Sequence, residues 1–369
     1  MVRGLGRVIV TTAINFIIVY TLVALIMSTV FSIFAYEQLK MMVQEMVQAR
    51  VQQIIKQYKN APPEVIAKIR KEINESLWRQ YGLLQPMHER ILSYTVRLLL
   101  FNLSGFAPLP QVTYPVPGEN ALEITLNALV RTAILFTTAS ILNMFINIFL
   151  GLQAAKRAGS LFDRALAIIA LISYSLPMWW MALILIYIFA YTYRIFPMGA
   201  KEVLNAIKEL NQMNLSPIEY FIRYIATWAY YMALPIITIM LVSFGAGAYV
   251  TRSMVLTVSR EDFVLVARAK GLPERTVLYK HILRAASPPI VTGIVFGLIG
   301  SLGGAIISER VFQWPGMGYV YWIALSNSDA SILLVNTWVT TIMYIAAYFI
   351  LDFVYMLLDP RVRIGKGVE

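Results

Sequence analysis

Residues 8–34, VIVTTAINFIIVYTLVALIMSTVFSIF, form a run of 27 residues without a charged side chain. An α-helix rises 1.5 Å per residue, so about 20 apolar residues cross the roughly 30 Å hydrocarbon core of a bilayer. The run therefore predicts a transmembrane helix. Arg3 and Arg7 precede it and no small-residue cleavage site follows, so we expect a retained span rather than a removed signal peptide.

Five further stretches are long and apolar enough to cross a bilayer: residues 128–152, 165–191, 227–250, 290–307 and 333–358. Hydrophobic residues make up 59% of the chain and charged residues only 14%, against about 25% charged residues in soluble domains. The sequence thus predicts an all-α membrane protein with six transmembrane helices. A soluble enzyme is excluded as the main interpretation.

Basic residues gather in particular loops and at the end of the chain. They are Lys156, Arg157 and Arg164 between the second and third stretches, seven Lys and Arg between residues 252 and 284, and Arg361, Arg363 and Lys366 in the tail. Because Lys and Arg concentrate in cytoplasmic loops, both termini are expected to be cytoplasmic in a multi-pass protein of the cell membrane. These loop and tail residues contribute to the net charge of +11, and their position beside apolar spans leads us to expect no nucleic-acid partner.

Between the first two spans lies a long segment that this orientation places outside the cell. Helical spacing of apolar residues predicts helices over residues 47–58, 65–77 and 86–101, with Gly82 as a cap before the third and the proline-rich residues 108–118 as an extended connector. The expected organisation is a tail and first span (1–36), an external helical domain with its linker (37–122), a five-helix core (123–358) and a cytoplasmic tail (359–369). Residues 201–223 are long enough for a second external amphipathic helix.

The chain lacks the residues that several kinds of chemistry require. There is no cysteine, the only histidines are His88 and His281, and neither a zinc-protease motif nor a phosphate-binding loop occurs. We therefore expect no metal site, no catalytic residues and no bound cofactor, and any ATP chemistry would have to come from another chain.

Residues 260–289, REDFVLVARAKGLPERTVLYKHILRAASPP, predict two short helices that meet at a corner. Arg268 and Lys270 would complement the dipole in the last turn of the first helix, and Gly271 would supply its left-handed cap. Pro273 and Glu274 would open the second helix. On charge alone, an ordinary basic loop and a surface for a partner protein explain this corner equally well.

Two sets of residues within the predicted spans can serve either helix packing or a transport pathway. The first is a glycine stripe on the fifth span, consisting of Gly293, Gly297, Gly300 and Gly304. The second is a set of polar residues on two faces of the second span, including Asn127, Arg131, Asn143 and Asn147. Arg131 can equally reach the external interface by snorkelling. In the third span, Pro177 predicts a kink.

Several segments in order along the chain resemble one known family, the inner-membrane permease subunits of ATP-binding-cassette importers of the dipeptide and oligopeptide type (the B-type subunit). They are VARAKGLPERTVLYKHILRAASPPIV in the corner, YGLLQPMHERILSY from Tyr81, SERVFQWPGMG from Ser308 and LDFVYMLLDPRVR from Leu351. The chain departs from the family where Leu265, Val266 and Ala267 replace its Glu-Ala-Ala, where the later proline is replaced near Arg284 and Ala285, and where NLSGF replaces a glycine-aspartate element.

The resemblance implies a transport subunit without its own ATPase site. It pairs with a second, homologous permease as a heterodimer in the lipid bilayer, is driven by two cytoplasmic ATPase subunits that carry ATP and Mg, and receives substrate from an external solute-binding protein. Residues 258–288 would be its ATPase-coupling loop. The residues expected at this joint are Ala267, Arg268, Ala269, Lys270, Gly271, Leu272, Pro273, Arg275, Lys280 and His281.

Within that joint, Ala267, Ala269, Gly271 and Leu272 are expected to form the packed core and the basic residues the rim. The substrate is expected to be a di- or oligopeptide, with an oligosaccharide as the alternative within the same architecture. An ion-coupled secondary transporter is the alternative from another class, and Asp352 is the best available intramembrane acid for it. A purely structural membrane scaffold is a third possibility.

Overall fold

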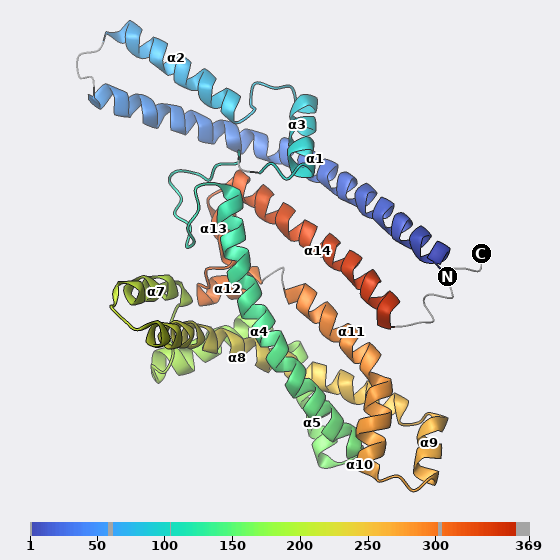
Figure 1. The fold of residues 1–369 in the computed structure, drawn as a ribbon. Coiled ribbons are helices and arrows are strands. Elements are labelled where there is room, and N and C mark those ends of the chain that lie inside the picture. The colour runs from blue at the N-terminus through green and yellow to red at the C-terminus, as the bar shows by residue number, and fades with distance from the viewer. Residues whose placement is uncertain (1, 58–61, 104, 302–304, 359–369) are drawn as a thin grey trace. The chain divides into compact units, whose positions relative to one another are not determined.

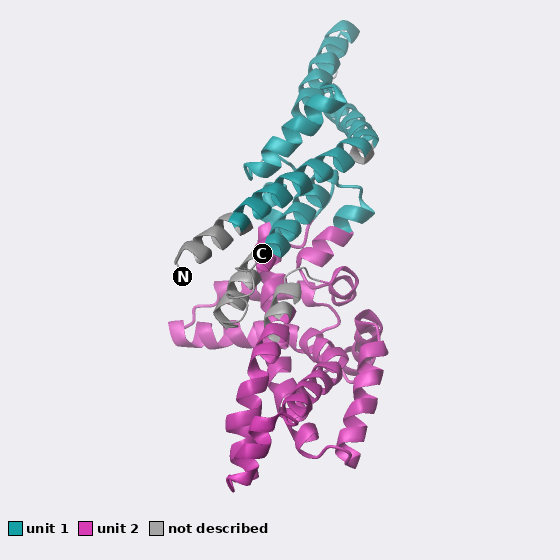
Figure 2. Cartoon of the chain, turned by 90° about the vertical axis from the view of Figure 1, so that its right-hand side faces the viewer, with its two compact units in different colours: residues 1–113, 118–125, 323–345 teal, residues 114–117, 126–322, 346–369 magenta. Residues whose placement is uncertain are grey.

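The computed structural model describes residues 2–57, 62–103, 105–301 and 305–358, and all regular structure in those residues is helical (Figure 1). The chain divides into two compact units (Figure 2). The first comprises residues 1–113, 118–125 and 323–345, and the second residues 114–117, 126–322 and 346–369. The prediction of an all-α membrane protein is confirmed.

The first unit is built on one very long helix. Helix α1 (Val2–Gln57) runs for 56 residues, of which Ala13–Ile33 is apolar enough to cross a membrane. No glycine or proline occurs between residues 8 and 57, so nothing in the sequence ends the helix where the apolar run stops. The helix predicted over residues 47–58 is therefore the last part of the first span's own helix.

Two shorter helices pack along α1, and both were predicted. Helix α2 (Pro63–Gln80) begins at Pro63, and α3 (Met87–Leu99) follows the expected Gly82 turn, where φ is +67°. Apolar residues at helical spacing on α1 face α2 and form the core of this unit, together with Leu77 and Leu83. The buried members from α1 are Leu39, Val43, Val47 and Val51. Figure 1 shows α1 and α2 side by side, in agreement with their contacts.

The proline-rich connector after α3 is attached to the start of α14 (Ala330–Leu358) by one buried carboxylate. Asp329 is 1% exposed, and its Oδ2 accepts a hydrogen bond from the backbone N–H of Leu109 at 2.8 Å. Its Oδ1 accepts from the N–H of Ile332 in the first turn of α14 at 3.2 Å. One side chain thus caps a helix and fixes an extended segment 220 positions away in the sequence.

The second unit contains most of the remaining helices. In chain order they are α4 (Ala121–Lys156, which begins in the first unit), α5 (Leu161–Ser175), α6 (Met178–Leu185), the π-helix η1 (Ile186–Thr192), the 3₁₀-helix η2 (Ala200–Glu202), α7 (Val203–Gln212), α8 (Pro217–Val258), α9 (Asp262–Ala269), α10 (Glu274–Thr276), the π-helix η3 (Val277–Ile282), α11 (Leu283–Ser301), α12 (Ile306–Phe312) and α13 (Met317–Ser326), which ends in the first unit. Helix α7 supplies an amphipathic helix within residues 201–223, as predicted.

Four helices of the described chain are long and apolar enough to span a membrane, at Ala13–Ile33, Ala121–Lys156, Pro217–Val258 and Ala330–Tyr348. The pair α5 and α6 with η1 makes a fifth if it is one broken span. Only 17% of the most apolar window of Ala13–Ile33 is buried, so most of its apolar surface is left for lipid or another protein.

The third predicted span, residues 165–191, differs from the expectation of one kinked helix. It is two helices bent by 97°, with the break at Leu176 and Pro177. Leu176 is extended (φ −87°, ψ 120°), the conformation that a following proline favours, and Pro177 then serves as the N-cap of α6. The expected kink is therefore a full break.

The fifth predicted span, residues 290–307, corresponds to α11 followed by α12. Ala305 is extended (φ −134°, ψ 95°) between them, so the helix does not continue to residue 307. Gly304 lies outside the described residues, and α11 is not among the four candidate spans found in the described chain. A sixth span therefore stays a prediction.

Candidate functional site

The corner between α9 and α10 has the geometry predicted for it. Gly271 has φ +76°, and its N–H donates to the carbonyl of Arg268 at 2.9 Å. The N–H of Leu272 donates to the carbonyl of Ala267 at 3.4 Å. This pair of bonds is the Schellman motif, in which a left-handed residue satisfies the last carbonyls of a helix. The Gly271 cap is confirmed, and Pro273 is the N-cap of the next helix.

An ion pair spans the corner. The Nη2 of Arg268 lies 2.7 Å from Oε1 of Glu274, and its Nε lies 3.2 Å from Oε2. Hydrogen bonds from Arg268 hold the pKa of the Glu274 carboxyl below its ordinary value, and the charge of Lys156 acts in the same direction. Both side chains are about half exposed, so the pair stabilises the corner by at most about 1 kcal/mol.

The inner face of the corner is anchored to three long helices. Val264 and Ala267 from α9 are buried, as are Val277, Leu278 and Ile282 from η3. They belong to one apolar cluster with residues of α4, α8 and α11, among them Leu152, Val255 and Ala286. Because close-packed cores move as units, a force on the corner is transmitted to these helices.

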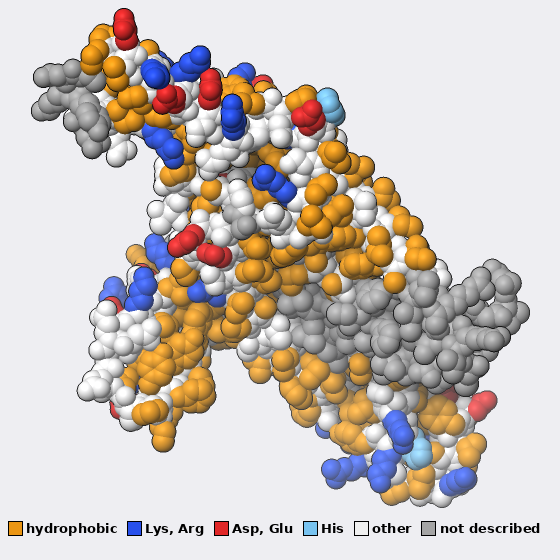
Figure 3. Space-filling view, turned by 45° about the horizontal axis from the view of Figure 1, so that its top comes forward, with side chains coloured by type: hydrophobic (Ala, Val, Ile, Leu, Met, Phe, Trp, Pro, Cys, Tyr) orange, Lys and Arg blue, Asp and Glu red, His pale blue; other side chains and the backbone are white. Residues whose placement is uncertain are grey.

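The outer surface of the corner carries exposed apolar residues beside exposed basic ones. Its five large exposed apolar residues, with exposed fractions from 36% to 57%, are Phe263, Leu265, Val266, Leu272 and Tyr279. Figure 3 shows the region of the corner, at the lower right, as orange apolar side chains among blue basic ones. A cluster of exposed apolar residues with a polar surround is typical of a protein-binding surface.

The residues expected at the joint therefore fall on two sides. Ala267 is 6% exposed and packs inward within the chain itself. His281 is half-buried. The remaining eight are exposed: Arg268, Ala269, Lys270, Gly271, Leu272, Pro273, Arg275 and Lys280. The sequence interpretation left out Phe263, Leu265, Val266 and Tyr279, although the helical spacing of Val264 and Ala267 marks their opposite face.

The polar residues of α4 are engaged in local or interhelix contacts. Asn127 donates from Nδ2 to the carbonyl of Pro117 at 2.9 Å, and the carbonyl of Asn127 accepts from Nη1 of Arg131. Asn143 donates from Nδ2 to Oγ of Ser243 on α8 at 2.7 Å. The Oδ1 atoms of Asn143 and Asn147 are buried without a hydrogen-bond partner among the described residues, so each leaves an acceptor for a water molecule or another ligand.

Two glycines outside the predicted stripe lie at close contacts between helices of this unit. A Cβ added to Gly151 of α4 would lie 2.6 Å from the carbonyl oxygen of Ala248 on α8. A Cβ on Gly245 of α8 would lie 2.5 Å from Oγ of Ser173 on α5. Gly293 and Gly297, in contrast, have no described atom within 4 Å of such a Cβ. Gly300 belongs to α11, and Gly304 lies outside the described residues.

A second polar cluster centres on Glu309, in the segment from Ser308 that carries part of the family resemblance. Glu309 is 1% exposed and accepts hydrogen bonds from the hydroxyl of Thr132 and from the N–H groups of Gly318 and Tyr319. The Thr132 hydroxyl in turn accepts from the N–H of Met317 at 2.8 Å. These bonds fasten the α12–α13 turn to α4. Within the described residues, no group of three or more potential metal-ligating residues occurs.

Comparison with known proteins gives one family model and several similar permeases. A family model described as "Binding-protein-dependent transport system inner membrane component" matches residues 147–364, which include the corner and Glu309 but not Thr132. An oligopeptide transport system permease protein of Bacillus subtilis is 27% identical over 298 residues, 80% of this chain and 87% of the relative. A di/tripeptide transport system permease protein of Pseudomonas aeruginosa is 30% identical over 291 residues, 76% of this chain and 82% of the relative. A dipeptide transport system permease protein of Escherichia coli is 29% identical over 311 residues, 81% and 87% of the two chains.

Proposed function

Because this chain belongs to the family of inner-membrane components of binding-protein-dependent transport systems, we propose that it is the permease subunit of an importer of short peptides. The relatives named above are an oligopeptide, a di/tripeptide and a dipeptide permease, and each match covers 82–87% of the relative. Nothing in the comparisons favours the oligosaccharide alternative. The protein is a multi-pass membrane protein, and its family is non-catalytic.

The family implies a solute-binding protein and an ATPase as partners, and we propose their number and the second permease. The family's transport depends on a solute-binding protein, and energy would come from two separate ATPase subunits that hold ATP and Mg. This chain would pair with a second, similar permease as a heterodimer. A Cβ added to Gly293 or Gly297 on α11 would meet no described atom within 4 Å, so this side of the helix has room for a close contact with that partner.

The proposed topology has six spans and two cytoplasmic termini. The four candidate spans and the bent pair account for five, and α11 with the residues after it would supply the sixth. The basic residues from 252 to 284 favour a cytoplasmic position for the corner. The end of α1 with α2 and α3, within residues 37–122, would then form a helical domain outside the cell, the core would occupy residues 123–358 and the tail residues 359–369.

The corner would couple ATP hydrolysis to transport. One observation carries this proposal: an exposed apolar face, with Leu265 and Val266 at its centre, lies on a capped corner whose inner face belongs to the same core as α4, α8 and α11. A cytoplasmic ATPase that covers this face and moves would displace those helices together. Asn143 and Asn147, with their free acceptor atoms, are the proposed polar contacts of the pathway.

Co-purification and reconstitution test this function. A tagged chain expressed with its neighbouring genes should co-purify with ATPase subunits, and the complex in vesicles should take up peptides when a binding protein and ATP are supplied. Uptake of oligosaccharides instead of peptides would shift the substrate class. Uptake driven by an ion gradient without ATP would contradict the importer proposal and favour a secondary transporter, and a complex without substrate-dependent ATP hydrolysis would favour a scaffold.

A further inference from the structure

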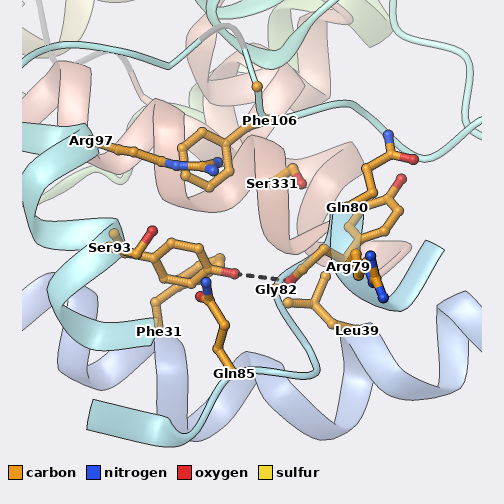
Figure 4. A pocket seen from close by; sticks show the side chains of 13 residues that line it. Phe31, Leu39, Arg79, Gln80, Gly82, Gln85, Ser93, Arg97, Phe106 and Ser331 are labelled. Carbon is orange, nitrogen blue, oxygen red and sulfur yellow. Dashed lines mark hydrogen bonds between the residues drawn. The ribbon is translucent and has the colours of Figure 1, made fainter. Parts of the chain in front are cut away.

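The first compact unit contains a small polar pocket that the proposed transport cycle does not yet use. The pocket has a volume of about 60 Å³ and is lined by residues of α1, the end of α2, the α2–α3 turn, α3, the connector and the first turn of α14 (Figure 4). Figure 4 shows Arg79 and Arg97 on opposite sides of the pocket. All of its lining residues belong to the first unit.

The lining is positively charged. Arg79 and Arg97 line the pocket, and none of its lining residues is acidic. Neither arginine takes part in an ion pair among the described residues. Asp329 does not itself line the pocket, but burial and the negative charge of Asp329 together raise the pKa of nearby Tyr81. Both oxygens of the Asp329 carboxylate already accept backbone hydrogen bonds. The positive charge of the pocket therefore has no counter-charge within its own walls.

The walls hold Arg97 in place before any ligand arrives, whereas the Arg79 side chain is exposed. The guanidinium carbon of Arg97 lies 6.0 Å from the centre of the Phe106 ring, which packs against Tyr94 with ring centres 5.7 Å apart. Tyr94 is 7% exposed, and its hydroxyl donates to the carbonyl of Tyr81 at 3.4 Å. Buried Arg90 fixes α3 to α1 through a hydrogen bond to the carbonyl of Ser32 at 3.0 Å. A preorganised site of this kind loses little entropy when it binds.

The size of the pocket selects its ligand. A water molecule needs about 10–15 Å³ of such space, so the pocket has room for a group of about four water molecules in size. A carboxylate group fits, whereas a whole peptide does not. Arginine binds carboxylates through paired, charge-assisted hydrogen bonds, and Gln80, Gln85 and Ser93 add neutral hydrogen-bonding groups.

We infer that this pocket receives an Asp or Glu side chain of the solute-binding protein when that protein docks on the permease. The inference rests on the proposed function, because the proposed orientation puts α2 and α3 on the side from which the binding protein delivers substrate. Arg79 and Arg97 recognise the carboxylate, and the aromatic wall aligns Arg97.

Zero-length cross-linking of the assembled transporter tests this directly. In the Arg97→Lys variant, a carbodiimide should couple the new amine to a carboxylate that enters the pocket, and mass spectrometry identifies the residue. We expect a cross-link to one Asp or Glu of the binding protein, with or without added peptide. A lysine at Arg70, an exposed residue of the same helix as Arg79, is the control and should not couple to that residue.

Affinity measurements complete the test. Arg79→Gln and Arg97→Gln should each weaken binding of the binding protein about tenfold, as expected for loss of a charge-assisted contact, whereas Arg70→Gln should change it less than twofold. A cross-link to the peptide instead of the binding protein would overturn the inference. If the variants bind the binding protein as tightly as the wild type and the binding protein still stimulates ATP hydrolysis, the pocket inference is wrong and the proposed function stands. A wild-type complex that no binding protein stimulates would overturn the proposed function as well.

Discussion

The hydroxyl of Thr132 donates a hydrogen bond to Oε1 of Glu309 at 3.0 Å, across 177 positions of sequence. The same hydroxyl oxygen accepts from the N–H of Met317, and the other carboxylate oxygen accepts from two further backbone N–H groups. A single threonine on α4 therefore completes a buried network that fixes the turn between α12 and α13.

Replacement of Thr132 by valine should destabilise the protein by about 2 kcal/mol. Valine has nearly the same shape, but it removes the hydroxyl that donates to Glu309, and the loss of a donor to a buried carboxylate costs about 1–3 kcal/mol. Thermal unfolding of the purified complex in detergent measures this loss. Thr132→Ser keeps the hydroxyl and is the control, so equal destabilisation by both variants would contradict the network's role.

Replacement of Gly271 by valine should uncouple ATP hydrolysis from transport. The φ of +76° costs a β-branched residue roughly 1–3 kcal/mol, and no atom of the described residues lies within 4 Å of an added Cβ, so the effect acts through the backbone. The corner is then expected to change shape. The ratio of peptide taken up to ATP hydrolysed in vesicles should fall severalfold.

Asparagine is the matched control at position 271, because it tolerates the left-handed conformation better than valine. Gly271→Asn should keep most of the coupling. Full coupling in the valine variant would show that the shape of this cap does not matter for transport.

The exposed apolar face of α9 should be sensitive to charge. Leu265→Glu would place a carboxylate on the surface that is proposed to enter an ATPase cleft, and the desolvation of that charge should weaken ATPase binding at least tenfold. The amount of ATPase that co-purifies with the tagged chain measures the effect. Leu265→Met keeps the surface apolar and should bind normally, and normal binding by the glutamate variant would place the ATPase elsewhere.

The ion pair across the corner should add little stability and should depend on pH. Because the pKa of Glu274 is lowered in the folded state, its contribution is present above the ordinary value of 4.5 and is lost as pH falls through the lower folded pKa. A double-mutant cycle with Arg268→Gln and Glu274→Gln, read by thermal unfolding, should give about 0.2–1 kcal/mol at pH 7 and less in high salt. A coupling energy that is unchanged at pH 3 would contradict the charge-based origin of this contact.

Local signals in the sequence predicted the elements whose causes are local. The α2 and α3 helices follow from Pro62, Pro63 and Gly82, and the corner follows from Gly271, because turn residues and apolar spacing act within a few positions. The 97° break at Pro177 was predicted only as a kink, since a proline weakens a helix and its tertiary contacts decide the angle.

Contacts between distant segments could not be predicted from the sequence. Neither the Thr132–Glu309 bond nor the pairing of Gly151 with Ala248 follows from any nearby pattern, because both depend on how α4 meets other helices. The inward position of Ala267 was missed for the same reason. A small residue fits both a partner surface and an internal core, and only the packing of α9 against α4 and α8 distinguishes them.

Two glycines should respond in opposite ways to the addition of one methyl group. Gly151→Ala would place Cβ 2.6 Å from the backbone carbonyl oxygen of Ala248, which cannot yield without separating α4 from α8, so we expect a loss of about 1–3 kcal/mol. Gly293→Ala meets no described atom and adds helix propensity, so the chain itself should fold at least as well. If Gly293 packs against the second permease, however, Gly293→Leu should reduce the amount of that partner recovered with the tagged chain while the thermal stability of the isolated chain stays unchanged. Full recovery of the partner with the leucine variant would exclude α11 from the heterodimer contact, and equal stability of the Gly151→Ala and wild-type chains would contradict the close crossing of α4 and α8.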